Sequence, residues 1–442
     1  MSEVLDKSFG VGLDEALGAV MEGKNVFLSG PGGSGKSTFI RQIQSLYAGS
    51  VLTVAPTGVA ALNIDATTAH RSFGLGMGIS TPETALDLKS KVKKLLKSKG
   101  LEKIILDEIS MHRADKLWEM DQKCRIARQK NEPFGGLQVI MVGDFFQNLP
   151  ILREDERELY YRFHNSELAF QHKVWEELNP YPVLLEKIFR QKSVFFSSLL
   201  NCMKAGERKK EIVETMNDQC YHFGEPIDAV TLTATNNQAD VINQKFFNEL
   251  KTPLKTFKAR KKGTFTSDPV PEILHLKEGA RVMITANSSE GDESKGFAYV
   301  NGSRGVITGL SYDGITVKLD DSGKEVLVEK HTWENIEQSP IKVKNPDGSV
   351  TEEIERKVIG SYSQYPIRLG YAVTVHRVQG LTLDKYNLDL GRGAFAPGMT
   401  YVACSRATDI RGLRLLTPLK ERDIITDKRV INFYKQTFEG KF

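Results

Sequence analysis

The stretch Gly30-Pro31-Gly32-Gly33-Ser34-Gly35-Lys36-Ser37 decides the fold of the N-terminal part of this chain. It fits the pattern GxxxxGK[ST] in full, follows the short apolar run 25–29, and precedes a segment (39–47) whose apolar residues recur at helical spacing. In that context the loop N–H groups and the helix start bind phosphate oxygens. Lys36 would hold the β- and γ-phosphates and the Ser37 hydroxyl would ligate Mg²⁺. The stretch therefore predicts ATP and Mg²⁺ as cofactors.

The flanking sequence predicts an α/β lobe around this loop. Short apolar runs recur at 51–54, 103–106 and 137–142, each β-branched and apolar on both faces. That pattern is typical of a parallel sheet covered by helices. A second α/β lobe is predicted to begin around Pro182, with strands at 183–185 and 230–235. The α/β pattern resumes near Ile367 and continues to the end of the chain.

The second lobe is interrupted by a β-rich segment. Short β-rich runs occur at 281–284, 305–307, 315–319 and 325–328, and the pairs Asn301-Gly302, Asp313-Gly314 and Asp347-Gly348 mark turns. We predict a small β-barrel inserted into the second lobe. The predicted division is a first lobe at 1–180 with a small insertion at about 75–100, the second lobe at 181–265 and 361–442, and the barrel at 266–360.

Bulk composition excludes several classes of protein. The 442 residues are 40% hydrophobic and 26% charged, with no apolar run near the roughly 20 residues that span a bilayer. The N-terminus shows no targeting signal, so we expect a cytoplasmic protein of bacterial or phage origin. Four scattered cysteines without a CxxC pair argue against a zinc site or a disulfide framework. The net charge of +4 decides nothing, because nucleic-acid binding depends on local patches.

The segment Leu86–Lys99 combines an apolar stripe with six lysines. One interpretation is a surface helix with a solvated face. The other is a small basic insertion near a nucleic-acid path. We favour the surface helix unless the stripe has no core on which to dock.

Two further strand ends carry candidate catalytic groups. Asp107-Glu108 follows four apolar residues, so Asp107 can reach the magnesium held by Ser37, and Glu108 can orient or deprotonate the attacking water. Gln147 lies in Gly143-Asp144-Phe145-Phe146-Gln147, at the end of the fourth strand, where it could contact the γ-phosphate. The alternative for Asp107-Glu108 is an ordinary acidic pair at a strand end. The alternative for the Gln147 motif is a polar loop.

The order of these motifs resembles that of the PIF-type (petite integration frequency) helicases of superfamily 1B. The resemblance covers about Gly30 to Leu416 and continues after Gln147 in the second half of the chain. The motifs that carry it are Thr53-Val54-Ala55-Pro56-Thr57-Gly58-Val59-Ala60-Ala61, Thr67-Thr68-Ala69-His70-Arg71-Ser72-Phe73-Gly74, Asp107-Glu108-Ile109-Ser110-Met111, Pro133-Phe134-Gly135-Gly136, Phe189-Arg190-Gln191, Thr235-Asn236, Val300-Asn301-Gly302-Ser303-Arg304-Gly305, His376-Arg377-Val378-Gln379-Gly380 and Tyr401-Val402-Ala403-Cys404-Ser405-Arg406-Ala407.

The resemblance implies a fold and a set of site residues. The fold is two RecA-like lobes with parallel sheets, a small insertion in the first and an SH3-like β-barrel in the second. Arg190 and Arg406 match the arginine fingers of the family, and with Lys36, Asp107, Glu108 and Gln147 they form the predicted catalytic set. The predicted nucleotide-binding residues are Gly32, Gly33, Ser34, Gly35, Lys36, Ser37, Thr38, Gln147, Arg190, Gly380 and Arg406, and Ser37 and Asp107 hold the metal.

A nucleic-acid path is also implied. Hydroxyls, amides and helix N-termini hold phosphates without reading sequence, and an aromatic ring such as His70 or Phe73 can stack on a base. Each of these groups could instead be buried and satisfied within its own lobe. The residues implied are Pro56, Thr57, His70, Phe73, Thr235, Asn236, Thr374 and His376.

The sequence departs from the family pattern at three places. No glutamine precedes the glycine-rich loop within Met1–Lys24, the fourth-strand motif continues as Gln147-Asn148-Leu149-Pro150, and Val378 stands where a serine is more common. Lys36, Asp107, Glu108 and both arginines are retained.

The predicted function is an ATP-dependent DNA helicase that moves 5′ to 3′ along single-stranded DNA. It would unwind duplex DNA, and G-quadruplex DNA is a further candidate substrate. Single-stranded DNA and forked or tailed duplexes are the predicted partners of a monomeric enzyme with no membrane association. Two alternatives stay open: a P-loop kinase or synthetase acting on a small molecule, and an ATP-gated nucleic-acid clamp that does not unwind.

Overall fold

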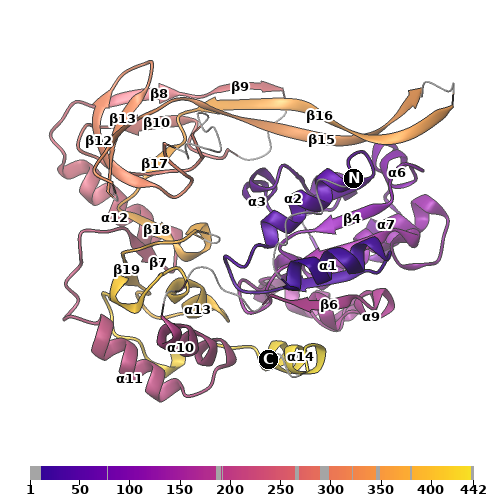
Figure 1. Cartoon of the computed structure of the whole chain (residues 1–442), viewed down its shortest axis with the longest axis horizontal. Helices are drawn as coiled ribbons and strands as arrows, with labels where there is room; N and C mark the ends of the chain where they lie inside the picture. The colour runs from indigo at the N-terminus through magenta and orange to yellow at the C-terminus, as the bar shows by residue number, and fades with distance from the viewer. Residues whose placement is uncertain are drawn as a thin grey trace. The chain divides into compact units, whose positions relative to one another are not determined.

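The structure, a computed structural model, describes residues 11–76, 78–185, 191, 193–263, 268–288, 298–320, 322–344, 349–378 and 381–439. It divides into two compact units, each described by itself (Figure 1). The first comprises residues 1–188, 336–359 and 427–442, and the second comprises 189–335 and 360–426. Residues 336–359 and 427–442 therefore lie with the first unit, whereas the predicted division assigned them to the barrel and to the second lobe.

A six-stranded sheet organises the first unit. Its strand order is β3-β2-β4-β5-β1-β6, and every neighbouring pair is parallel. The strands are β1 (Val26–Ser29), β2 (Val51–Ala55), β3 (Thr67–Thr68), β4 (Lys103–Leu106), β5 (Gln138–Val142) and β6 (Tyr181–Leu184). The strands predicted in the first lobe are confirmed, as is an α/β fold with a parallel sheet.

Strand β6 corrects one prediction. The run 183–185 was expected to open the second lobe, but β6 pairs with β1 in the first sheet, with Leu28 opposite Val183. An apolar run shows that a strand is buried, and its sequence does not say which sheet supplies its neighbour.

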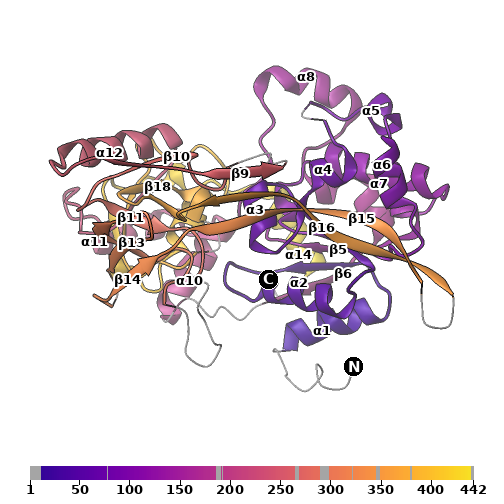
Figure 2. The same cartoon turned by 90° about the horizontal axis from the view of Figure 1, so that it is seen from above.

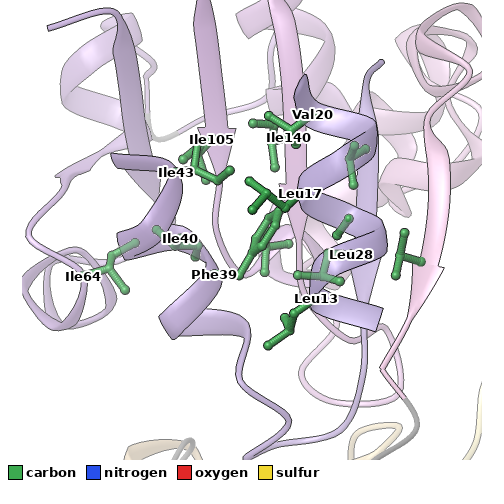
Figure 3. Close-up of a cluster of buried hydrophobic side chains, with 14 of the residues drawn as sticks. Leu13, Leu17, Val20, Leu28, Phe39, Ile40, Ile43, Ile64, Ile105 and Ile140 are labelled. Carbon is green, nitrogen blue, oxygen red and sulfur yellow. The ribbon is translucent and has the colours of Figure 1, made fainter. Parts of the chain in front are cut away.

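Helices α1 (Val11–Met21) and α2 (Lys36–Leu46) cover one face of this sheet (Figure 3). Their apolar side chains recur at helical spacing and pack on residues from strands β1, β4 and β5. The cluster includes Leu13, Leu17, Val20, Leu28, Phe39, Ile40, Ile43, Ile64, Ile105 and Ile140. Burying each such side chain contributes about 1.5–3 kcal/mol.

The other face is closed by the C-terminal helix α14 (Lys428–Thr437). Phe27 alternates with Val26 and Leu28 along β1, so its ring points away from α1 and α2. That ring meets Phe433 at 5.9 Å between centroids, and Phe433 stacks on Phe170 at 4.2 Å. This aromatic packing explains why the end of the chain belongs to the first unit.

The remaining helices of the first unit flank its loops. They are α3 (Gly58–Asn63), α4 (Ala69–Phe73), α5 (Pro82–Leu86), α6 (Ser90–Leu96), α7 (Ala114–Arg128), α8 (Glu154–Phe163) and α9 (Lys173–Leu178). In α6, Val92, Leu95 and Leu96 are buried, and the helix packs against α7. The stripe therefore has a core on which to dock, as the surface-helix interpretation requires.

A four-stranded parallel sheet organises the α/β part of the second unit. Its order is β18-β7-β19-β20. The strands are β7 (Thr231–Thr233), β18 (Ala372–Thr374), β19 (Tyr386–Asp389) and β20 (Leu413–Leu415). The helices are α10 (Val194–Ala205), α11 (Lys209–Cys220), α12 (Asn236–Glu249) and α13 (Met399–Cys404).

The β-rich segment folds around a hydrophobic core of its own. Five antiparallel strands follow the order β14-β13-β12-β11-β17, and β8 pairs with β10. Their bounds are β8 (Lys255–Lys258), β10 (Ile273–Leu276), β11 (Arg281–Ile284), β12 (Arg304–Leu310), β13 (Ile315–Leu319), β14 (Glu325–Val328) and β17 (Ile367–Leu369). The four predicted β-rich runs are confirmed as strands, and the predicted turn Asp347-Gly348 lies outside the described residues.

Two long strands extend from this segment. They are β15 (His331–Lys344) and β16 (Val350–Gln364), and β16 also pairs with β9 (Arg260–Gly263). We call residues 336–344 and 349–359, which belong to the first unit, the ribbon. Among the described helices, none combines the length and apolar content needed to cross a bilayer.

We expect His172 to make the first unit sensitive to mild acid. Its Nδ1 accepts the Val174 N–H at 3.2 Å and caps α9, which requires a neutral ring. Burial, with His164 nearby, lowers the pKa of His172 to about 4. Because the unfolded chain takes up this proton near pH 6.5, stability should fall as the pH drops from about 6.5 to about 4, by roughly 2 kcal/mol.

Urea unfolding of the parent chain and of His172→Asn at pH 7 and at pH 5 measures this loss. Asparagine keeps a cap acceptor without titrating, so the variant should lose less stability than the parent on acidification. Equal losses in the two proteins would contradict the assignment.

Candidate functional site

Five loops meet along one edge of the first sheet. Because all six strands are parallel, their carboxyl ends open on the same side, which is where ligands bind to open α/β sheets. Strand β1 leads into the glycine-rich loop at Gly30, β4 into Asp107 and β5 into Gly143. On the far side of β4, β2 leads into Pro56 and β3 into α4.

The glycine-rich loop has the geometry of a phosphate cradle. Gly33 and Gly35 adopt positive φ angles of 84° and 99°, which favour glycine. Lys36, the first residue of α2, donates from Nζ to the carbonyl oxygens of Gly30 at 2.6 Å and Pro31 at 2.9 Å. The Ser34 hydroxyl is buried and forms no hydrogen bond within the described part of the chain. This set of donors fits a polyphosphate, and Ser37 and Thr38 lie exposed on the first turn of α2.

The acid pair lies on a strained turn directly after β4. The Asp107 N–H donates to the Val54 carbonyl at 2.9 Å, which fixes the residue at the strand end. Glu108 has φ 47° and ψ 49°, a left-handed conformation that costs a residue with a side chain about 1–3 kcal/mol. Burial and the neighbouring Glu108 raise the pKa of Asp107 to about 7. Two crowded carboxyl groups of this kind suit a divalent cation.

His112 holds this turn, and sequence reasoning did not identify it. The residue is buried, and its Nε2 lies 3.1 Å from the Asp107 carbonyl oxygen, which accepts the hydrogen bond. Gly143 supports the same turn, because a Cβ atom there would lie 2.9 Å from the Ile109 nitrogen. A histidine four residues after an acid pair has no distinctive pattern, so only the fold could reveal this contact.

Gln147 is buried in a hydrogen-bond network that includes the end of the chain. Its Nε2 donates to Asp144 Oδ2 at 2.9 Å. The hydroxyl of Tyr434, on α14, lies 2.6 Å from Ser29 Oγ and accepts the Phe145 N–H at 3.1 Å. Tyr434 therefore joins the strand before the glycine-rich loop to the loop that carries Gln147, a role that its sequence neighbourhood does not indicate.

The four nucleic-acid candidates in the first unit differ in exposure. Thr57 is exposed and caps α3, because its hydroxyl accepts the Ala60 N–H at 3.2 Å. Pro56 and His70 are partly exposed. Phe73 is fully buried, so its ring forms part of the core in this structure and cannot stack on a base. The predicted stacking role is therefore not available to Phe73 without a movement of α4.

Buried charges on α7 fix the chain that follows α4. Lys123 donates from Nζ to the Gly74 carbonyl at 3.0 Å and pairs with Glu119 at 2.8 Å. Lys116 donates to the Gly78 carbonyl at 2.7 Å. Leaving one of these buried charges unpaired would be strongly destabilising, so the chain at Gly74 and Gly78, directly after α4, is held against α7.

In the second unit, the candidates gather at the carboxyl end of two paired strands. Strands β7 and β18 place Thr233 opposite Thr374, which is buried. Thr235 follows β7, is exposed, and caps α12 by accepting the Gln238 N–H at 3.3 Å. Asn236 is exposed beside it. The side chain of His376 lies outside the described part of the structure.

Of the two predicted arginine fingers, Arg406 lies within the described residues. Arg406 is fully buried, and its guanidinium donates to the Val402 carbonyl and the Ser405 hydroxyl, each at 3.0 Å. It also contacts the Val378 carbonyl at 3.4 Å. In this structure the side chain is therefore held by its own unit. Arg190 and Gly380 lie outside the described residues.

Comparison with known proteins places the chain among helicases. Residues 11–214 match the family model for PIF1-like helicases. The chain is 31% identical over 434 residues to the ATP-dependent DNA helicase Pif1 of Bdellovibrio bacteriovorus, covering 96% of this chain and 91% of that protein. It is 31% identical over 438 residues to human ATP-dependent DNA helicase PIF1, covering 96% of this chain but 63% of the human protein. The chain thus spans under two thirds of the length of that relative.

A solved structure shows similarity over the full length. The crystal structure of Pif1 from Bacteroides sp in complex with ADP-AlF4 has a TM-score of 0.86 and 30% sequence identity. The alignment covers 99% of each chain.

We expect removal of the Tyr434 hydroxyl to destabilise the first unit. Tyr434→Phe leaves the buried Phe145 N–H without its acceptor and Ser29 without its partner, at a cost of about 1–3 kcal/mol in the free energy of unfolding. Urea unfolding measures the change. Tyr161→Phe is the matched control, because among the described residues the exposed Tyr161 hydroxyl donates to Glu167 alone, so its removal should change stability little. Equal stabilities for the parent and Tyr434→Phe would show that the network is not needed.

Proposed function

This chain belongs to the PIF1-like helicase family, and we propose that it is an ATP-dependent DNA helicase that moves 5′ to 3′ along single-stranded DNA and unwinds duplex DNA. One observation carries the proposal. The glycine-rich loop, the pair Asp107-Glu108 and Gln147 lie on one edge of a parallel sheet, followed by the Pro56-Thr57 and His70 loops. A nucleotide site and a strand-binding site on one rigid edge are the arrangement that a motor requires.

The proposal includes the finer architecture. The two α/β parts would be RecA-like lobes, the segment at about 75–100 the insertion of the first, and the antiparallel five-stranded segment an SH3-like barrel of the second. Parallel sheets in both units and the separate core of the antiparallel segment support this assignment.

At the nucleotide end, the residues would divide the work between binding and proton transfer. Lys36 and the loop N–H groups hold the β- and γ-phosphates, and Ser37 with Asp107 holds the magnesium ion. When bound, ATP would supply the γ-phosphoryl group that is transferred to water, and Mg²⁺ would neutralise the charge that develops on it. Glu108 accepts the proton of the attacking water, and Gln147 senses whether the γ-phosphate is present. His112 is a positioning residue, because it holds the Asp107 carbonyl and touches no reacting atom.

The arginines would couple the two units to this chemistry. Arg190 and Arg406 supply positive charge to the γ-phosphate, a contribution worth about 10³–10⁵ in kcat in related phosphoryl-transfer sites. For Arg406 this requires an exchange of its present partners, Val402 and Ser405, for a phosphate oxygen. Such an exchange would link nucleotide binding to the packing of the second unit.

The DNA strand would contact hydroxyls and helix starts rather than base edges. Thr57 and Thr235 each cap a helix and lie exposed, so both can offer a hydroxyl and nearby N–H groups to phosphates. His70 is the candidate for base stacking. Pro56, Asn236, Thr374 and His376 complete the proposed path, and Phe73 would support it from the core. The active form proposed is a monomer on single-stranded or tailed duplex DNA.

Lys36→Ala should abolish DNA-stimulated ATP turnover. The parent chain is expected to hydrolyse ATP faster when single-stranded DNA is added, and the variant should lose at least about a hundredfold in kcat because the phosphates lose their charged donor. A coupled phosphate-release assay measures both. Lys24→Ala, at the opposite edge of the sheet, is the control. Robust turnover by the parent that ignores added DNA would contradict the helicase assignment.

The direction of movement along the DNA strand is tested by an unwinding assay on duplexes with a single 5′ tail, a single 3′ tail or no tail. The proposal expects strand separation of the 5′-tailed substrate alone. Transfer of phosphate to a small molecule in place of water would favour a kinase, and DNA binding without unwinding would favour a clamp.

Arg406→Lys should separate the two roles of that arginine. Lysine keeps the charge but lacks the planar fork, so we expect kcat to fall about 10³-fold and unfolding stability by about 1–3 kcal/mol. ATP turnover is measured at a temperature at which circular dichroism shows the variant folded. Arg411→Lys is the control, since that side chain is exposed and, within the described part of the chain, pairs with Asp409 alone. Normal kcat in folded Arg406→Lys would leave Arg406 with a structural role alone.

A further inference from the structure

A lysine-lined cleft lies between α6 and the ribbon of the first unit. Figures 1 and 2 show β15 and β16 running past α6. The cleft encloses ≈ 950 Å³. We call it the lysine cleft, and the basic residues that line it are Lys93, Lys94, Lys97, Lys99 and Lys342.

The ribbon is fixed to the lobe, so the cleft has defined walls. Glu352 accepts the Ser98 hydroxyl at 3.1 Å and the Lys99 N–H at 2.9 Å. A Cβ atom on Gly100 would lie 1.8 Å from the Glu352 carbonyl oxygen, so only glycine permits this backbone approach. On the other strand of the ribbon, Glu337 pairs with Arg71 at 3.2 Å and also with Lys91.

The five lysines of the cleft leave it with an excess of positive charge. Each is exposed, and none forms an ion pair with another described residue, whereas Lys91 on the same helix is paired with Glu337. Among the described residues of the lining, Glu352 is the one carboxylate, and its pKa is lowered by the Lys99 N–H, the Ser98 hydroxyl and the nearby charges of Lys342 and Lys99. A concave surface with five exposed ammonium groups and one carboxylate raises the local concentration of a polyanion.

The lining also indicates which polyanion fits. Protein interfaces are depleted in lysine and rich in aromatic anchors, and none of the described residues that line this cleft is aromatic. Grooves for single strands combine positive charge with aromatic rings on which bases stack. A cleft that offers lysines without aromatic rings suits phosphates whose bases are already stacked with one another, as they are in a duplex.

We propose that the lysine cleft binds the backbone phosphates of duplex DNA, apart from the residues proposed to hold the translocating single strand. This inference rests on the proposed helicase function and adds a second DNA contact to it. It also gives a role to four of the six lysines of the Leu86–Lys99 segment, whose apolar stripe is satisfied by packing on α7.

The test compares the binding of two DNA substrates by the full chain. One is a duplex with a 5′ single-stranded tail, and the other is the tail alone, both titrated by fluorescence anisotropy over a series of salt concentrations. The parent should bind the tailed duplex more tightly than the tail, and we call this difference in affinity the duplex increment. The triple variant Lys93→Ala/Lys97→Ala/Lys342→Ala should lose that increment. Each lost phosphate contact should cost about eightfold at 0.1 M salt and reduce the salt slope for the tailed duplex by about 0.9.

A control variant carries the same change in net charge at lysines that do not line the cleft. Lys24→Ala/Lys130→Ala/Lys173→Ala removes three exposed lysines outside the cleft and should keep the duplex increment. The proposal is overturned if the parent shows no duplex increment, if the cleft variant keeps it, or if the control loses it equally. Equal loss of affinity for the tail alone would also overturn it, because the cleft would then belong to the single-strand path.

ATP turnover stimulated by the tail alone keeps this test separate from the proposed function. It should be unchanged in the cleft variant. If the parent shows that stimulation but no duplex increment, the cleft proposal fails and the helicase proposal stands. If the parent shows no stimulation, the helicase proposal itself fails.

Discussion

Six parallel strands in the first unit constrain everything else, because their carboxyl ends all open along one edge. The order β3-β2-β4-β5-β1-β6 sets which loops are neighbours on that edge. The glycine-rich loop after β1 lies one strand from the Gln147 loop and two strands from Asp107 and Glu108. The candidate DNA contacts follow after β2 and β3. Hydrogen bonds between strands fix these spacings more firmly than loops could. The site residues are therefore held in place by a rigid sheet.

The edge is supported by side chains that touch no ligand. His112 holds the Asp107 carbonyl below a left-handed Glu108, and Gly143 leaves room for that turn. Tyr434, on α14, contacts Ser29 before the glycine-rich loop and Phe145 in the loop that carries Gln147. Strain at the acid pair is thus tolerated because the surrounding backbone is held by buried hydrogen bonds, each of which would be costly to leave unmade.

Charge is used in two different ways in the first unit. On α7, Lys123 and Glu119 are buried and paired, and together with Lys116 they fix the segment after α4. Such pairs give the segment a defined position because breaking one would leave an uncompensated charge in the core. In the lysine cleft, by contrast, the ammonium groups are exposed and unpaired, so their field extends to a partner in solution. Only their arrangement in the fold separates these structural charges from charges available for binding.

The sequence alone determined the family, which the comparisons confirm, and the parallel strands of the first lobe. The glycine-rich loop and the strand-end acids are local patterns, and a local pattern can be read without knowing what packs beside it. Tertiary structure alone decided that β6 joins the first sheet, that Phe73 and Arg406 are buried, and that Tyr434 reaches the Gln147 loop. The Tyr434 hydroxyl contacts Phe145, which is 289 positions away in the sequence, and Ser29, which is 405 positions away. No window of sequence contains both partners of such a contact, so the fold had to bring them together before either role was defined.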